Sequence, residues 1–297
     1  MDTVFVTFIY PEALKFFEAF LSNLNNQSDK NFKLLIFNDG CNETQIGNFL
    51  KDCQYEMEII DNNCNSIAEN RMKAFKYLSK QPFKNFIFGD IDDTFAENRV
   101  EVIKEALKVH DIVFNELHLC DKDLKIIQEK MISSYLGSKL YVSLDMIKEQ
   151  NLIGFSHLSI SKIIIDKLSN IKCDSSVKVV DWVVISKILK EHVAFFENRT
   201  YTNYVFHGEN LALYDGNSLE NLLFLINIKI STYLQLIELD NWYENEINEL
   251  SKIKNLIESD EDIKQQFISF YSLKKRVHYP WWAQIKNSEE MKNELCI

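Results

Sequence analysis

Two aspartates separated by one residue form a candidate chemical site in this sequence of 297 residues. They are Asp90 and Asp92, and the segment 88–93 reads FGDIDD. In an extended backbone, side chains two residues apart point to the same side, so both carboxylates can approach one hard divalent cation. Such an ion would also bind diphosphate oxygens and neutralise charge on a leaving nucleoside diphosphate. The alternative is a solvated acidic turn in which Asp92 or Asp93 accepts hydrogen bonds from the backbone around 96–98.

This acidic segment follows a short apolar run that predicts a strand at Asn85–Phe88. Four similar runs predict further strands at Val4–Ile9, Phe32–Phe37, Glu56–Ile60 and Ile112–Asn115. Amphipathic stretches separate them, and this alternation is typical of βα units and a mainly parallel sheet. Ligands of open α/β sheets bind beyond the carboxyl ends of the strands, so the position of the aspartates itself favours a binding site.

Local signals predict the elements around this segment. Pro11 suits the start of a helix, and Ser66 with Glu69 forms a capping box that opens the helix carrying Arg71. Farther along, we expect helices at Ser143–Gln150 and Asp181–Glu191, and strands at Ala194–Phe196 and Tyr201–Phe206 that a turn at 197–199 separates. After Gly216, apolar residues at helical spacing predict a helical C-terminal region.

Four segments together resemble the N-terminal half of the family 2 glycosyltransferases. That family has a first strand, an Asp-Asp-Gly-Ser turn, an Ala-x-x-Asn/Arg helix and an Asp-x-Asp-Asp segment. The matching segments here are Phe5–Phe8, Asn38–Cys41 (NDGC), Ala68–Arg71 (AENR) and Asp90–Asp93 (DIDD). The resemblance implies an α/β fold of the GT-A type that binds nucleotide sugars, with a mainly parallel central sheet and a helical C-terminal appendage. We expect the catalytic domain over residues 1–215 and the helical region over 216–297.

The same resemblance implies a site for a nucleotide-sugar donor. The donor nucleotide would be bound by Thr7, Phe8, Asp39, Arg71, Asp90 and Ile91. In this scheme Asp39 hydrogen-bonds the base and Arg71 approaches the base or a phosphate. Asp90 meets the ribose, and Asp92 is the principal ligand of Mn²⁺ or Mg²⁺. Two alternatives are structural: Asp39 as an Asx-turn residue and Arg71 as a surface cation on its helix.

Two later segments resemble the family more weakly. Asp181 and Trp182 are similar to a Glu-Asp-Trp motif whose aspartate is the general base for the acceptor hydroxyl, although Val180 replaces the glutamate. Asp181 could also be the N-cap of the predicted helix, and both roles are compatible. The segment 204–210 (YVFHGEN) resembles a Tyr-Arg-x-His segment, so His207 would contact the metal or the diphosphate. The alternative is an ordinary loop histidine.

The resemblance implies a metal-dependent glycosyltransferase that moves a sugar from a UDP-linked donor to a hydroxyl of a glycan or glycolipid, with inversion, in bacterial polysaccharide or glycoconjugate synthesis. Two other hypotheses stay open. The segment 86–95 (FIFGDIDDTF) also resembles the first motif of haloacid-dehalogenase phosphatases, with Asp90 as nucleophile and Asp92 as acid/base. A catalytically silent binding protein could keep the same fold.

Composition limits the partners. A formal net charge of -11 disfavours binding to nucleic acid. The apolar stretch Asn221–Ile237 contains too many polar residues to span a bilayer, and the N-terminus has no signal-peptide pattern. We therefore expect a cytoplasmic protein, peripheral at most at the inner membrane face. Lys274–Trp282 pairs cations with aromatic residues, which suits membrane contact or self-association through the C-terminal helices. The six cysteines lack zinc-site spacing and should be free thiols.

Overall fold

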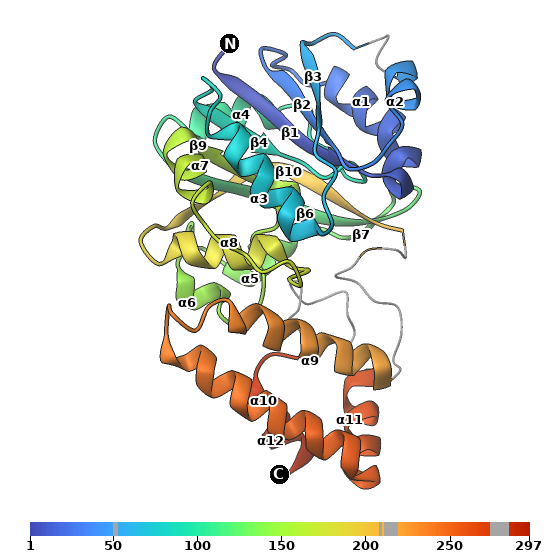
Figure 1. Ribbon diagram of the computed structural model, residues 1–297, viewed down its shortest axis with the longest axis vertical. Coiled ribbons are helices and arrows are strands. Elements are labelled where there is room, and N and C mark those ends of the chain that lie inside the picture. Colours follow the sequence, from blue (N-terminus) through green and yellow to red (C-terminus); the bar gives the residue numbers. More distant parts are fainter. Residues whose placement is uncertain (50–52, 208–209, 211–218, 274–284) are drawn as a thin grey trace.

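The computed structural model describes residues 1–49, 53–207, 210, 219–273 and 285–297 (Figure 1). A ten-stranded sheet forms its centre, in the order β3-β2-β1-β4-β9-β6-β10-β5. The strands on this path are β1 (Thr3–Ile9), β2 (Lys33–Asn38), β3 (Met57–Asp61), β4 (Asn85–Phe88), β5 (Thr94–Phe95), β6 (Ile112–Asp121), β9 (Leu158–Ser161) and β10 (Ala194–Phe206). Two short strands lie beside it: β7 (Ile126–Gln128) pairs with β6 and β8 (Tyr141–Val142) pairs with β10.

Six strands of this sheet point in the same direction. β3, β2, β1 and β4 are mutually parallel. β9 is antiparallel to both β4 and β6, so β6 and its parallel partner β10 point the same way as β1. The prediction of a mainly parallel sheet is therefore confirmed. From β1 the chain continues to β2 and β3 on one side of β1, and then crosses to β4 on the other side of β1. The strand order therefore reverses between β1 and β4, which leaves a crevice at their carboxyl ends.

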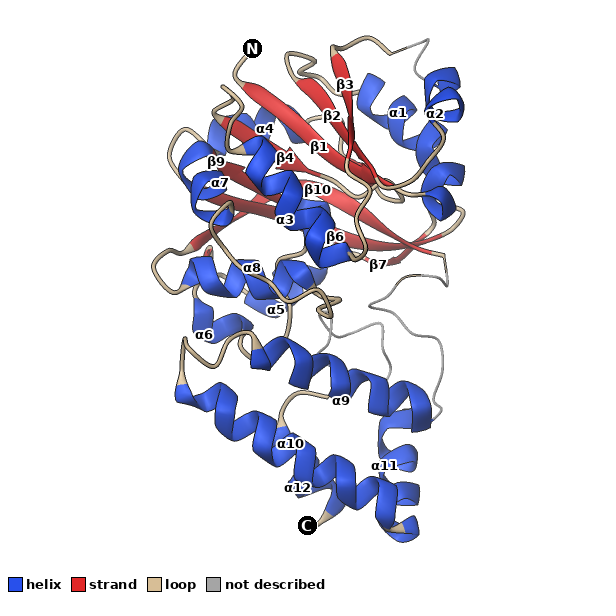
Figure 2. Ribbon diagram, viewed as in Figure 1, coloured by secondary structure: helices blue, strands red, loops and turns tan. Residues whose placement is uncertain are grey.

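Both faces of the sheet are covered, which explains the continuous apolar runs of its strands. Val4, Val6 and Phe8 of β1 belong to one core cluster, and Phe5 and Ile9 belong to the other. Helices α1 (Phe17–Asn25) and α4 (Arg99–Ala106) pack on the Phe5 face, and helices α3 (Ile67–Leu78), α7 (Lys162–Leu168) and α8 (Val180–Leu189) pack on the Phe8 face (Figure 2).

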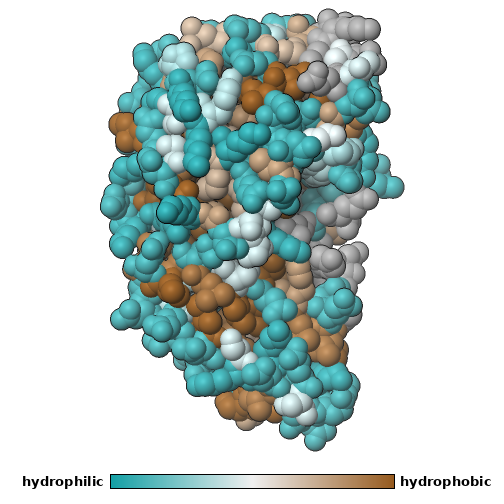
Figure 3. All heavy atoms as spheres, viewed as in Figure 1, coloured by the Kyte–Doolittle hydropathy of each residue, from teal (hydrophilic) through white to brown (hydrophobic). Residues whose placement is uncertain are grey.

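The described residues after 218 form four helices, α9 (Leu219–Leu234), α10 (Asn241–Ser259), α11 (Glu261–Leu273) and α12 (Ser288–Leu295). They continue the core of the Phe8 face, because Tyr233 of α9 meets Trp182 of α8 edge to face at 5.7 Å. Figure 3 shows hydrophobic residues at the surface in the lower part of the molecule, where these helices lie. Leu234 and Leu256 are among the exposed apolar residues of α9 and α10. The expected helical character is confirmed, whereas the division after residue 215 stays a prediction. Lys274–Trp282 lies outside the described residues.

The smaller elements are the 3-10 helices η1 (Pro11–Phe16) and η3 (Phe155–His157) and the helices α2 (Glu43–Phe49), α5 (Met131–Leu136) and α6 (Leu144–Ile147). All six cysteines are free, as the sequence predicts. None of the described helices combines the length and the apolar character that a bilayer crossing requires.

The structure corrects three local predictions. β10 continues through 197–199, where a β-bulge replaces the expected turn. Inside the bulge, the Glu197 carboxylate accepts a hydrogen bond from the backbone N–H of Arg199 at 3.0 Å, so this N–H has a partner although it lies outside the strand ladder. The helix expected at Ser143–Gln150 is reduced to α6, and the non-helical chain that follows brings the Asn151 side chain into a hydrogen bond with Asp181. β9 was not predicted at all.

Candidate active site

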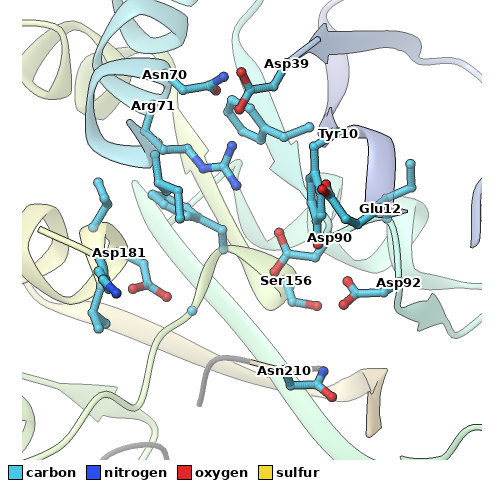
Figure 4. A pocket seen from close by; sticks show the side chains of 18 of the residues that line it. Tyr10, Glu12, Asp39, Asn70, Arg71, Asp90, Asp92, Ser156, Asp181 and Asn210 are labelled. Atoms are coloured by element: carbon cyan, nitrogen blue, oxygen red, sulfur yellow. The ribbon is translucent and has the colours of Figure 1, made fainter. Parts of the chain in front are cut away.

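A cleft of about 520 Å³ opens at the carboxyl ends of β1 and β4. Among its lining residues are Asp39, Arg71, Asp90, Asp92, Asp181 and His207 (Figure 4). Phe8 and Ile91 line it as well. The structure therefore brings together the predicted site residues, with one exception.

The exception is Thr7, which does not line the cleft. It is fully buried, and its hydroxyl has no hydrogen-bond partner among the described residues. Successive residues of a strand face opposite sides, so Phe8 points to the cleft while Thr7 shares the face of Phe5 and Ile9.

Asp39 is presented to the cleft by a turn that its neighbours hold. The side chain of Asn38 both donates to the carbonyl of Cys41, at 2.9 Å, and accepts the N–H of Cys41, at 2.8 Å. Gly40 has a φ of +90°, a conformation that favours glycine. Because Asn38 supplies the side-chain bonds of the turn, the Asx-turn interpretation of Asp39 is wrong, and its carboxylate is directed into the cleft (Figure 4).

Arg71 lies on the first part of α3, which the predicted capping box opens. The Ser66 hydroxyl accepts the N–H of Glu69 at 3.2 Å. The guanidinium carbon of Arg71 lies 3.3 Å from the centre of the Phe8 ring, so Arg71 is not a surface cation. No described residue forms a hydrogen bond or ion pair with this guanidinium. Burial lowers the pKa of Arg71, and the carboxylates of Asp90 and Asp181 oppose that shift.

The loop after β4, residues 89–93, is called the acidic loop, and aromatic rings of the core pack against its first residue, Gly89. A Cβ on Gly89 would lie 2.6 Å from the Phe95 ring and 2.8 Å from the Phe5 ring, so only glycine fits. The Oδ1 atom of Asp93 accepts the N–H of Val205 at 2.9 Å and its Oδ2 accepts the hydroxyl of Ser156. Asp93 is 1% exposed and bonds to these partners and not to the 96–98 backbone, so the interpretation as a solvated turn is wrong.

The other two aspartates of the loop face the cleft. Asp90 is partly buried in the cleft wall, and this desolvation, followed by the charge of Asp92, raises its pKa to about 7 against the opposing charge of Arg71. Oδ2 of Asp92 lies 2.9 Å from Nε2 of His207. The His207 ring in turn packs on Phe16 with ring centres 4.9 Å apart. Beyond His207, residues 208–209 of the predicted segment lie outside the described residues.

Asp181 lies across the cleft from Asp90 and Asp92 (Figure 4). Helix α8 begins at Val180 with Val179 as its N-cap, so the N-cap interpretation of Asp181 is wrong. Burial raises the pKa of Asp181 to about 6, and hydrogen bonds from the Trp182 backbone and the Asn151 side chain oppose the rise. The next side chain, Trp182, is fully buried and donates from its indole to the carbonyl of Ile147 at 2.7 Å, which fixes the start of α8.

Several cleft residues were missed in the sequence, namely Tyr10, Glu12, Asn151, Ser156 and Lys178. Tyr10 and Glu12 could have been found from their position just after β1. The other three come from segments without a recognisable motif, and only the tertiary structure brings them to the cleft.

The side chains at the cleft offer a partial set of ligands for a divalent ion. Among the described residues, no group of three or more His, Cys, Asp or Glu side chains is arranged to hold a metal. Asp92 and His207 still offer two ligand types at the cleft wall, with side chains 16% and 10% exposed. Mg²⁺ is often bound by one or two carboxylates and completed by substrate phosphates, so these residues fit an ion that a bound diphosphate would complete.

No protein-family model and no curated protein matches the sequence, but solved structures resemble it. S. aureus TarS 1-349 in complex with UDP-GlcNAc aligns with a TM-score of 0.56 at 11% identity, over 99% of this chain and 82% of that chain. The mannosyltransferase PcManGT from Pyrobaculum calidifontis, in complex with GDP-Man and Mn²⁺, aligns with a TM-score of 0.55 at 11% identity. That alignment covers 80% of this chain and 64% of that chain. The chain has a glycosyltransferase fold. At such low identity the likeness concerns the fold alone.

Proposed function

We propose that this protein is a GT-A glycosyltransferase that moves a sugar from a nucleoside-diphosphate sugar, UDP-linked, to an acceptor hydroxyl with inversion. The observation that supports it is the meeting of Asp39, Asp92 and Asp181 in one cleft, at the crevice where the strand order reverses. Proteins of similar fold bind UDP-GlcNAc or GDP-Man, which supports a nucleotide-sugar donor.

The donor nucleotide would lie between Asp39 and the acidic loop. The Asp39 carboxylate can accept an N–H group of a base, and Asp90 can accept a ribose hydroxyl. The guanidinium of Arg71 is held flat by Phe8 and directs N–H donors toward the base or the phosphates. The acceptor would enter from the side of Asp181.

Asp181 would act as the general base. A base is most effective when its pKa lies near the working pH, and burial has moved Asp181 in that direction, to about 6. Its carboxylate would take the proton from the acceptor hydroxyl as that oxygen attacks the anomeric carbon from the face opposite the diphosphate. The buried Trp182 beside it keeps the start of α8 from moving.

Asp92 and His207 would hold Mn²⁺ or Mg²⁺ together with the diphosphate. When bound, the ion neutralises charge on the leaving diphosphate. The phosphatase hypothesis gives Asp39 and Asp181 no role, and the structural neighbours favour the transferase over it. A glycan or glycolipid acceptor and a part in polysaccharide synthesis remain predictions of the sequence resemblance. A cytoplasmic location and membrane contact or self-association remain predictions from the composition of the sequence.

Thermal unfolding with UDP tests the proposal directly. A ligand at 100 times its Kd stabilises the folded state by about 2.7 kcal/mol, so UDP with Mn²⁺ should raise the Tm by several degrees. Asp92→Asn should lose most of that rise, whereas Asp123→Asn, on an exposed loop outside the cleft, should keep it. No rise with UDP or GDP in the wild-type protein would contradict the proposal.

Donor hydrolysis separates an enzyme from a silent binding protein. The wild-type protein should release nucleoside diphosphate slowly from one member of a donor panel that includes UDP-GlcNAc and GDP-Man. Asp92→Asn should reduce this release at least 100-fold while the fold is retained. Binding of UDP without release from any donor would support the silent binding protein.

A further inference from the structure

Ser156 connects two buried charged side chains beneath the acidic loop. Its hydroxyl donates to Oδ2 of Asp93, and its carbonyl oxygen accepts a hydrogen bond from Nη2 of Arg99 at 3.0 Å. Asp93 and Ser156 are each 1% exposed and Arg99 is 0% exposed. Neither Asp93 nor Arg99 lines the cleft. These charges therefore cannot be explained as groups that meet a substrate.

Arg99 fixes the beginning of the acidic loop. Its Nη2 also donates to the carbonyl of Phe88, at 2.6 Å, and its Nε donates to Oδ1 of Asn115, at 2.9 Å. The guanidinium carbon lies 4.5 Å from the centre of the Phe95 ring, one of the rings that press against Gly89. A planar guanidinium can serve these three acceptors at once, whereas the compact ammonium of lysine cannot copy the fork.

Asp93 fixes the end of the loop to β10. It follows Asp92 directly, and its Oδ1 accepts the N–H of Val205, two residues before His207. One side chain thus connects the backbone beside Asp92 with the backbone beside His207. The Asp92 carboxylate and the His207 imidazole, 2.9 Å apart, lie on the two segments that Asp93 joins.

We propose that Asp93 and Arg99 are positioning residues that set, through Ser156, the placement of Asp92 against His207 and thereby the affinity of the donor site for its cation and diphosphate. This inference rests on the proposed function. A buried carboxyl group and a buried guanidinium are costly unless they are hydrogen-bonded, and here both form hydrogen bonds with the same serine. Burial lowers the pKa of Arg99 to about 9, and the charge of Asp93 opposes that shift.

Ser156→Ala tests the connection without removing a charge, and Ser159→Ala is its matched control. Ser159 is also fully buried, three residues farther along, and its hydroxyl has no hydrogen-bond partner among the described residues. Calorimetric titration of UDP at a series of Mn²⁺ concentrations gives the affinity for each. Loss of a residue that orients a metal ligand typically costs 10- to 100-fold, so we expect Ser156→Ala to weaken Mn²⁺-dependent UDP binding at least 10-fold. Ser159→Ala should stay within about twofold of wild type, because it removes no hydrogen bond.

Asp93→Asn distinguishes positioning from metal ligation. The amide oxygen can still accept from Val205 and the amide nitrogen can donate to the Ser156 hydroxyl, so this variant should retain most of the Mn²⁺ affinity that Asp92→Asn loses. In donor hydrolysis, Ser156→Ala should raise the KM for donor and for Mn²⁺ more than it lowers kcat. Equal losses in Asp93→Asn and Asp92→Asn would assign Asp93 as a ligand and overturn the proposal.

Amide hydrogen exchange gives a readout that needs no substrate. The amides of 205–207 should exchange faster in Ser156→Ala than in Ser159→Ala, because the Asp93 carboxylate that binds Val205 loses its second anchor. Unchanged exchange together with unchanged UDP affinity in Ser156→Ala would overturn the inference. If wild-type protein binds no UDP with Mn²⁺, the proposed function itself fails, and that result is recognised in the wild type before any variant is compared.

Discussion

His207 and Asp92 are separated by 115 positions in the sequence, yet Nε2 of His207 lies 2.9 Å from Oδ2 of Asp92. Strand pairing explains the meeting. The short strand β5 begins two residues after Asp92 and pairs with β10 through Thr94 and Asn203. The end of β10 is therefore drawn alongside the acidic loop, and His207 follows one residue after the strand.

Replacing His207 tests whether this contact serves the cation. We expect His207→Ala to weaken Mn²⁺-dependent UDP binding about 10- to 100-fold, because it removes one of the two proposed ligands and its contact with Asp92. Titration calorimetry at several Mn²⁺ concentrations measures it. His192→Ala is the control, since His192 lies outside the cleft. The same affinity in both variants would show that His207 does not hold the cation.

Asp181 should give the enzyme a rate that rises with pH. Burial raises the pKa of Asp181 to about 6, and only its ionised form can accept a proton from the acceptor hydroxyl. Donor turnover should therefore increase through about pH 6 and level above it. Asp181→Asn should abolish acceptor-dependent turnover at every pH while leaving UDP binding intact. Wild-type rates in this variant would remove Asp181 from the mechanism.

The same raised pKa predicts the opposite trend for stability. The folded chain holds the Asp181 proton up to about pH 6, whereas the unfolded chain releases it near the ordinary value of 3.8. The contribution to the free energy of unfolding is thus complete below about pH 4 and is lost as the pH rises through about 6. When the free energy of unfolding from urea titrations is plotted against pH, wild type should lose stability between these pH values relative to Asp181→Asn. The difference should be on the order of 3 kcal/mol in total. Parallel curves would contradict the shift.

The first half of the fold, and the gathering of most of the candidate residues at one cleft, could be predicted from the sequence because their signals are local. β1 to β4 are compact apolar runs, and the capping box at Ser66 and the NDGC and DIDD segments each lie in one short stretch. The sequence does not show which residues of β1 face the cleft. Every residue of β1 is buried, so its side chains do not alternate between apolar and polar, and Thr7 was therefore predicted to line the site together with Phe8.

The second half of the site depends on contacts distant in sequence. β9 has only four residues, two of them serines, and becomes a strand because β4 and β6 pair with it on both sides. Asn151 and Ser156 belong to the segment around this strand and carry no motif of their own. Their roles toward Asp181 and Asp93 exist only once the segment is folded.

Arg71 can be assigned to the base or to the phosphates by comparing two ligands. Its guanidinium is stacked on Phe8 and lies free of described hydrogen-bond partners, so a ligand can take its N–H groups. If Arg71 binds phosphate, Arg71→Ala should weaken UDP about 10-fold or more and leave uridine unchanged. If it contacts the base, both ligands should weaken. Arg71→Lys should not rescue binding, because an ammonium lacks the planar fork. Unchanged affinity for both ligands would exclude Arg71 from the donor site.

Gly89 should contribute to the stability of the fold as well as to the position of the loop. A methyl group there would lie 2.6 Å from the Phe95 ring and 2.8 Å from the Phe5 ring, and both rings are fixed in the core. Gly89→Ala should therefore reduce the free energy of unfolding by about 1 to 3 kcal/mol. Gly47→Ala is the matched control, because nothing lies within 4 Å of its added Cβ and Gly47 is inside helix α2. That variant should gain about 0.5 to 1 kcal/mol from helix propensity. Urea unfolding at pH 7 measures both changes, and equal stability of the two variants would mean that the rings beneath the acidic loop yield and do not fix its position.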